Sequence, residues 1–167
     1  MDFKTNSLPT SVVTNKGMNK EITKEDIEHA IHVACDYLYT NHKHLIDEAA
    51  HEESIVADIL APYLRKIIAD YDVTTVYNRE GEWEDRKPKT DLEGKTIIPD
   101  IIIHKFGPRG PNISVVEVKG YWNKQDRKED EGSLQRLAAK HKYKYLYRLE
   151  LSRDNYALIP VSPIRVP

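Results

Sequence analysis

The sequence predicts an α/β fold, with one mixed β-sheet flanked by helices in the order α-α-β-β-β-α-β-β. Three observations predict it. Apolar residues recur every three or four positions between residues 24 and 70, which is typical of amphipathic helices. Short β-branched runs bounded by turn residues follow from residue 73, which is typical of strands. A further helical stretch at 129–141 separates the third strand from the last two.

The first part of the chain is predicted to be helical. Residues 1–20 are polar and without an apolar period, so we expect an extended arm before a single domain at 21–167. Thr23 to Asp26 resemble a capping box and predict a helix over about 24–39. A longer apolar stripe predicts a second helix over about 43–70, kinked at Pro62.

The strongest strand signals form a pair. The runs 96–104 and 112–119 are rich in Ile and Val, and Gly107-Pro108-Arg109-Gly110-Pro111 separates them. This arrangement predicts a hairpin. The same pattern predicts further strands at 73–77, 143–151 and 156–161, and the charged residues 80–95 read as a solvated loop.

Composition narrows the class of protein. The chain has 167 residues, of which 40% are hydrophobic and 31% charged, and its formal net charge is −2, as in a folded globular protein. Cys35 is the single cysteine, which excludes an internal disulfide framework and a cysteine zinc finger. No signal peptide or membrane span is expected from the polar N-terminus and the absence of long apolar runs. We therefore expect a cytoplasmic protein.

The hairpin is predicted to gather charged side chains. If its turn is centred between Pro108 and Arg109, facing residues have numbers that sum to 217. Asp100 then lies opposite Glu117, with β-carbons about 5 Å apart. Lys119 follows two residues later on the same face of the sheet, because side chains alternate along a strand.

These residue types point to metal-assisted chemistry. Two facing carboxylates in an apolar hairpin repel each other unless a cation lies between them. Oxygen ligands suit a hard divalent ion such as magnesium, with manganese as a substitute. The Lys119 ammonium can orient a water or stabilise charge on a phosphate oxygen. The alternative is that Asp100 and Glu117 face solvent at strand ends, with Lys119 as an ordinary salt-bridge partner.

Ile98-Pro99-Asp100, followed after the hairpin by Val115-Val116-Glu117-Val118-Lys119, resembles the signature of the PD-(D/E)XK nuclease superfamily. The resemblance implies a restriction-endonuclease-like core and a magnesium-dependent phosphodiesterase. It also implies that Asp100, Glu117 and the backbone carbonyl of Val118 hold the metal, while Lys119 helps to activate water.

Many members of this superfamily add a glutamate from the helix before the first core strand. Glu52 and Glu53 are both candidates here. The segment from Glu53 to Leu64 resembles the corresponding helix of small stand-alone members, with the acid ten residues before Tyr63-Leu64. The resemblance therefore favours Glu53 over Glu52 as the third metal ligand.

The charge distribution indicates a nucleic-acid partner. Lys and Arg outnumber acids at 119–148, whereas acids dominate 21–60, so the basic half follows directly on the candidate site. A solvated surface with scattered charges is the competing interpretation. Gln135 is expected to face water, and Tyr121-Trp122 to cover the sheet edge more readily than to stack on a base. The residues expected to bind nucleic acid are Lys124, Arg127, Lys128, Arg136 and Lys140.

The function expected from these features is that of a magnesium-dependent deoxyribonuclease. We expect an endonuclease acting on DNA with structure-dependent or weak sequence specificity, as a homodimer or recruited by a protein partner. The alternative is a catalytically inactive nuclease fold that binds nucleic acid or assembles a larger DNA-processing or defence complex.

Overall fold

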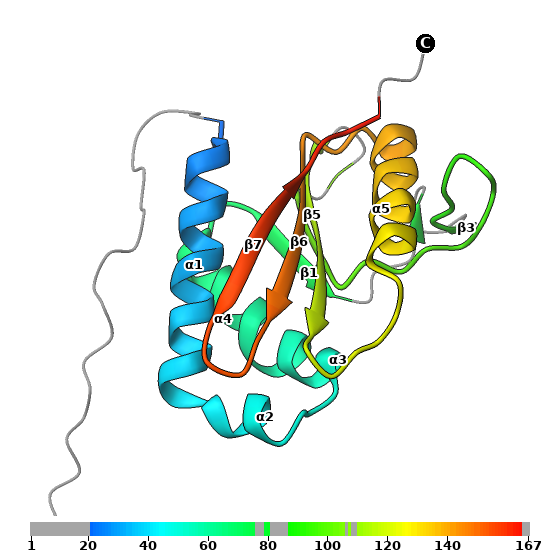
Figure 1. The fold of residues 1–167 in the computed structure, drawn as a ribbon. Coiled ribbons are helices and arrows are strands. Elements are labelled where there is room, and N and C mark those ends of the chain that lie inside the picture. The colour runs from blue at the N-terminus through cyan, green and yellow to red at the C-terminus, as the bar shows by residue number, and fades with distance from the viewer. Residues whose placement is uncertain (1–20, 76–78, 81–86, 106, 108–109, 165–167) are drawn as a thin grey trace, which may run out of the picture.

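The computed structural model describes residues 21–75, 79–80, 87–105, 107 and 110–164 (Figure 1). The expected arm at 1–20 and the turn centre at 108–109 lie outside the described residues. The helices are α1 (Lys24–Asn41), α2 (Lys43–Asp47), α3 (Glu52–Ile55), the π-helical turn η1 (Val56–Leu60), α4 (Ala61–Ile67) and α5 (Arg127–His141). The strands are β1 (Asp72–Thr75), β2 (Arg79–Glu80), β3 (Lys87–Pro88), β4 (Ile101–His104), β5 (Asn112–Gly120), β6 (Tyr145–Leu151) and β7 (Tyr156–Val161).

The prediction of an α/β fold with one mixed sheet flanked by helices is confirmed. The five-stranded sheet has the order β1-β4-β5-β6-β7. β5 and β6 are parallel and joined through α5, whereas the other neighbouring pairs are antiparallel. A separate two-stranded ribbon consists of β2 and β3. Among the helices of the described residues, none is both long enough and apolar enough to cross a membrane.

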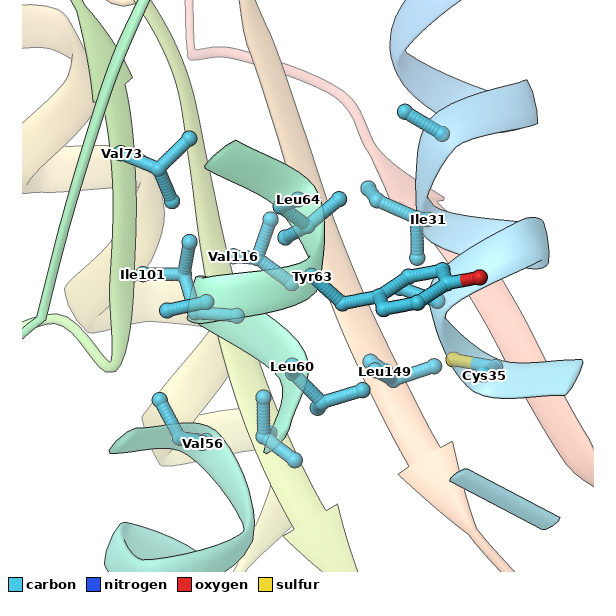
Figure 2. Packing of buried hydrophobic residues seen from close by; sticks show 14 of the residues in the cluster. Ile31, Cys35, Val56, Leu60, Tyr63, Leu64, Val73, Ile101, Val116 and Leu149 are labelled. Carbon is cyan, nitrogen blue, oxygen red and sulfur yellow. The ribbon is translucent and has the colours of Figure 1, made fainter. Parts of the chain in front are cut away.

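Helices cover both faces of the sheet (Figure 1). On one face, residues of α1, η1 and α4 pack against Ile101, Val116 and Leu149 in the larger core, which Figure 2 shows. On the other face, α5 packs through Leu134 and Leu137. Successive residues of β4 and β5 pack against opposite faces, because side chains alternate along a strand. The α5 face of the sheet therefore carries the side chains on which the candidate site depends.

The first helix confirms its predicted start. The Thr23 hydroxyl accepts the backbone N–H of Asp26, and the Asp26 carboxylate accepts that of Thr23. The second predicted helix was wrong as one continuous element, because 43–70 divides into α2, α3, η1 and α4. Ala49 adopts a positive φ of 50° between α2 and α3, which ends a helix. The π-helical turn ends at Leu60, two residues before Pro62, whose missing N–H interrupts the regular hydrogen-bond ladder.

The predicted hairpin register is confirmed in its central part. Ile101 pairs with Val116, Ile102 with Val115, and Ile103 with Ser114, and a register shift follows at His104. The strand is shorter than expected, because β4 begins at Ile101 rather than at Thr96. Pro99 lacks the N–H that a continued ladder would need. Asp100 therefore lies just before the strand.

Candidate active site

The candidate site lies where β5 continues beyond β4. Since β4 begins opposite Val116, the N–H groups of Val118 and Gly120 extend past the last antiparallel pair. Two carboxylates accept them instead. Asp100 Oδ2 lies 2.7 Å from the N atom of Val118, and Glu52 Oε1 lies 3.0 Å from that of Gly120. Side chains thus complete the edge of β5 where a strand would otherwise pair.

The same edge of β5 carries the carbonyl of Val118. In a strand, the N–H and C=O of one residue point to the same neighbour. Because the Val118 N–H donates to Asp100, the Val118 carbonyl points toward the side of β5 on which Asp100 lies. This is the backbone oxygen that the resemblance implies as a ligand.

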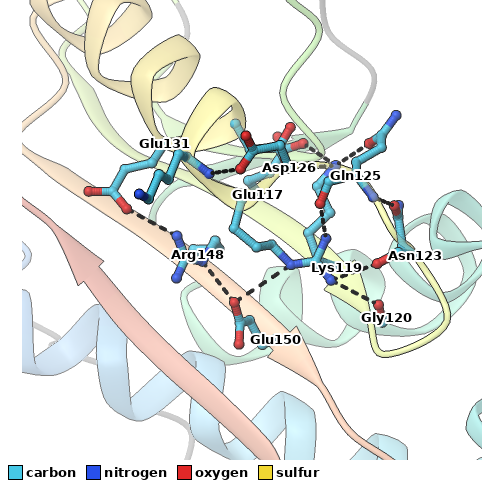
Figure 3. A network of polar contacts seen from close by, with 12 residues as sticks. Glu117, Lys119, Gly120, Asn123, Gln125, Asp126, Glu131, Arg148 and Glu150 are labelled. Atoms are coloured by element: carbon cyan, nitrogen blue, oxygen red, sulfur yellow. Dashed lines mark hydrogen bonds and ion pairs between the residues drawn. The ribbon is translucent and has the colours of Figure 1, made fainter.

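Glu117 and Lys119 project from β5 onto the face covered by α5 (Figure 3). Lys119 is only 7% exposed, and its Nζ atom lies 3.1 Å from Glu117 Oε1. The parallel neighbour β6 places Arg148 beside Glu117 and Glu150 beside Lys119. Arg148 in turn forms ion pairs with Glu131 and Glu150, both at 3.0 Å. The site is therefore embedded in a network of alternating charges.

The carboxylates of the site are held in an unfavourable electrostatic environment. Burial, and then the neighbouring Glu117 carboxylate, raise the pKa of Asp100 from 3.8 to about 7. Burial also raises the pKa of Glu117, although Lys119 opposes that rise. The negative charge of Glu52 adds to both shifts. Burial lowers and Glu117 raises the pKa of Lys119, and the net change is upward, so its ammonium stays charged at neutral pH.

The structure brings together Asp100, Glu117, Val118 and Lys119. It places Glu52 with them rather than Glu53, the residue preferred from the resemblance. Glu53 is exposed, because adjacent helical residues point about 100° apart and only one of the two can face β5.

The five residues expected to bind nucleic acid divide into two groups. Arg136 forms an ion pair with Asp91 at 3.0 Å, Lys140 contacts Thr90, and Arg127 donates to the carbonyls of Asn123 and Gly120. Those three side chains thus hold parts of the chain together. Lys124 and Lys128 are exposed.

The residues expected to remain on the surface also make specific contacts. Gln135 donates from its side-chain amide to the Ser162 carbonyl at 2.9 Å. Trp122 packs against the larger core, while Tyr121 is 42% exposed. A Cβ added to Gly120 would lie 2.3 Å from the Trp122 ring, so Gly120 permits Trp122 to cover the end of β5.

Sequence reasoning did not identify two partners of Lys119. Gln125 Oε1 accepts a hydrogen bond from its Nζ atom at 3.1 Å, and Asp130 Oδ2 lies 3.4 Å away. The order of the elements could have indicated these partners. A helix that directly follows β5 and leads to a parallel strand starts at the carboxyl end of β5. Its first turn therefore lies beside Lys119.

The oxygen donors of the site fit a hard divalent cation, and they are few. Within the described ranges, no group of three or more His, Cys, Asp and Glu side chains forms a ready metal cluster. Asp100, Glu117 and the Val118 carbonyl are oxygen donors, and magnesium typically binds one or two carboxylates while it keeps several waters. Comparison with protein-family models, curated proteins and solved structures finds no match to this chain.

Proposed function

We propose that this chain is a magnesium-dependent deoxyribonuclease with a restriction-endonuclease-like core of the PD-(D/E)XK type. One observation carries the proposal: Asp100 and Glu117, with raised pKa values, lie beside a buried lysine at the end of β5. Leaving two such carboxylates ionised without a cation is costly. A divalent ion would relieve this repulsion, whereas the Lys119 charge opposes the rise in the pKa of Asp100 without cancelling it.

In this mechanism Asp100, Glu117 and the Val118 carbonyl hold the metal. When bound, a magnesium ion supplies Lewis-acid polarisation of the phosphate and lowers the pKa of an attacking water. The hydrogen bond from Val118 N–H fixes the orientation of the Asp100 carboxylate. Lys119 orients the attacking water and stabilises charge that grows on the phosphate.

Glu52 is the better candidate for the additional helix acid. Its carboxylate accepts from Gly120 N–H, and its charge acts on Asp100 and Glu117. The Glu52 carboxylate would add negative charge beside a cation held by Asp100 and Glu117. Glu53 is exposed and would need refolding of α3 to do the same.

The proposed substrate is DNA, cut internally with weak sequence preference. Lys124 and Lys128 are exposed next to the site and can approach phosphates. The small basic surface favours help from a second copy of the chain or from a recruiting protein. Cys35 is buried and free, consistent with the cytoplasmic location that we propose.

The test is incubation of the purified chain with linear, circular, single-stranded and branched DNA in Mg²⁺ and in Mn²⁺. The wild type is expected to cut at least one form, and Lys119→Ala to cut none at a temperature where circular dichroism shows that it is folded. Cleavage by Lys119→Ala at the wild-type rate would contradict the proposal.

Calorimetric titration with Mn²⁺ separates the enzyme from the inactive assembly subunit. The enzyme is expected to bind Mn²⁺, and Asp100→Asn to lose that binding. Absence of Mn²⁺ binding to the wild type, together with tight DNA binding, would favour the assembly subunit.

A further inference from the structure

Lys119 is held by three elements of the fold. Its Nζ atom lies 3.1 Å from Glu117 Oε1 on the same strand, 3.1 Å from Gln125 Oε1 in the following loop, and 3.4 Å from Asp130 Oδ2 in the first turn of α5. An ammonium has three N–H donors and no acceptor. Its donors therefore face two carboxylate oxygens at ion-pair distance and one neutral acceptor.

Asp130 lies in the first turn of α5, where a carboxylate is favoured by the helix N-terminus, and its side chain reaches Lys119. Its Oδ2 atom is buried without a hydrogen-bond partner, and a buried polar atom left without a hydrogen bond is costly. The Lys119 ammonium is the cation that faces this oxygen. Its helical neighbour Glu129 shows the ordinary arrangement, with a side chain 71% exposed and only a 3.8 Å ion pair to Lys95.

Gln125 is fixed by the loop between β5 and α5. Its backbone N–H donates to Asn123 Oδ1, and Arg127 donates to its carbonyl. Figure 3 shows the Gln125 side chain reaching Lys119, whereas the Asn123 and Gly120 carbonyls accept from Arg127. The loop thus directs one neutral acceptor at the ammonium.

We propose that Asp130 is a positioning residue for Lys119, and that the uncharged Gln125 side chain contributes to this positioning. This inference rests on the proposed nuclease function. In that function Glu117 binds the metal and is no longer a dedicated partner of Lys119. Asp130 and Gln125 then keep Nζ in place, independently of Glu117, so that it remains aimed at the attacking water.

The kinetic test compares two neighbouring acids. Asp130→Ala is expected to lower kcat about 10- to 100-fold with little change in KM, since small misplacements of a catalytic group cost about this much. Glu129→Ala is the matched control and is expected to retain the wild-type kcat. Asp130→Asn preserves shape without charge and is expected to lie between them. Gln125→Ala is expected to lose less than Asp130→Ala.

A second readout does not depend on cleavage. In ¹⁵N-lysine-labelled protein at mildly acidic pH and low temperature, Lys119 is expected to show a protected ammonium signal, assigned by its absence in Lys119→Ala. Asp130→Ala and Asp130→Asn are expected to weaken that signal, and Glu129→Ala to leave it unchanged.

The outcomes separate the two proposals. Wild-type kcat and an unchanged Lys119 signal in both Asp130 variants would overturn the positioning role while the nuclease proposal stands. A wild type that cuts no DNA, with a Lys119 signal lost in Asp130→Asn, would contradict the nuclease proposal yet support Asp130 as the residue that positions Lys119.

Discussion

Two aspartates of this protein, the buried Asp91 and the half-buried Asp100, have opposite electrostatic surroundings. Asp91 is 1% exposed, and its carboxylate accepts the N–H groups of Glu93 and Lys95 and pairs with Arg136. Burial alone would raise its pKa, but these partners lower it overall. Asp100 accepts one N–H group, faces Glu117, and has a pKa raised to about 7.

A structural carboxylate can be told from a functional one by the groups that surround it. Asp91 is fully satisfied by donors and one arginine, so its charge stabilises the loop against α5. At Asp100, burial and the charges of Glu117 and Glu52 outweigh the opposing effects of Lys119 and the Val118 N–H. Buried surplus charge of this kind is characteristic of functional sites.

The largest expected effect is on cleavage. Asp100→Asn is expected to reduce DNA cleavage at least about 10³-fold, because it removes a proposed metal ligand. Asp91→Asn is expected to keep the wild-type kcat at temperatures where it is folded. Initial rates on the best DNA form in Mg²⁺ measure both. Equal loss of activity in the two variants would show that the different electrostatic surroundings of Asp91 and Asp100 do not distinguish a structural from a functional carboxylate.

The next effect distinguishes the two neighbouring glutamates of α3. Glu52→Gln is expected to lower kcat about 10- to 100-fold, since it weakens an acid beside the metal site. Glu53→Gln is expected to change kcat less than about twofold. The same cleavage assay decides between them. A larger effect of Glu53→Gln would restore the residue that the family resemblance favoured.

On stability the two aspartates are expected to respond with opposite signs. Asp91→Asn is expected to lower the free energy of unfolding by about 1–3 kcal/mol, because Arg136 loses its charged partner. Asp100→Asn is expected to raise it by about 1–3 kcal/mol above pH 7 without added metal, because the asparagine keeps an acceptor for Val118 N–H without the charge. Denaturant titration measures both values. Destabilisation by Asp100→Asn would indicate that its charge is compensated.

The smallest expected effect is on how steeply the free energy of unfolding changes with pH. The native protein binds the Asp100 proton up to about pH 7, whereas the ordinary pKa is 3.8. Between these values the unfolded state binds fewer protons, so the free energy of unfolding falls as pH rises, by at most about 1.4 kcal/mol per pH unit for this group. The stabilisation by Asp100→Asn is expected to be absent below pH 3.8 and complete above about pH 7.

Magnesium provides the control for that slope. Saturating Mg²⁺ is expected to flatten the difference in pH dependence between the wild type and Asp100→Asn, because the ion stabilises the ionised carboxylate. Urea titrations at several pH values measure this difference. A wild-type slope equal to that of the variant in metal-free buffer would contradict a raised Asp100 pKa.

Several local features of this protein could be predicted from short stretches of its sequence. The register of Ile101 with Val116 and the alternation that groups Glu117 with Lys119 were predictable, because strand pairing across a short turn and side-chain alternation depend on neighbouring residues. The capping box that starts α1 was predictable for the same reason.

Which distant groups meet these residues depends on the tertiary fold. The choice of Glu52 over Glu53, the approach of Asp130 and Gln125 to Lys119, and the internal pairing of Arg136 with Asp91 all depend on how helices rotate and dock on the sheet. The break of 43–70 into several helices likewise depends on packing. A helical pattern shows which face of a helix is apolar. Which of two adjacent residues at the edge of that face meets the sheet, as with Glu52 and Glu53, depends on long-range contacts.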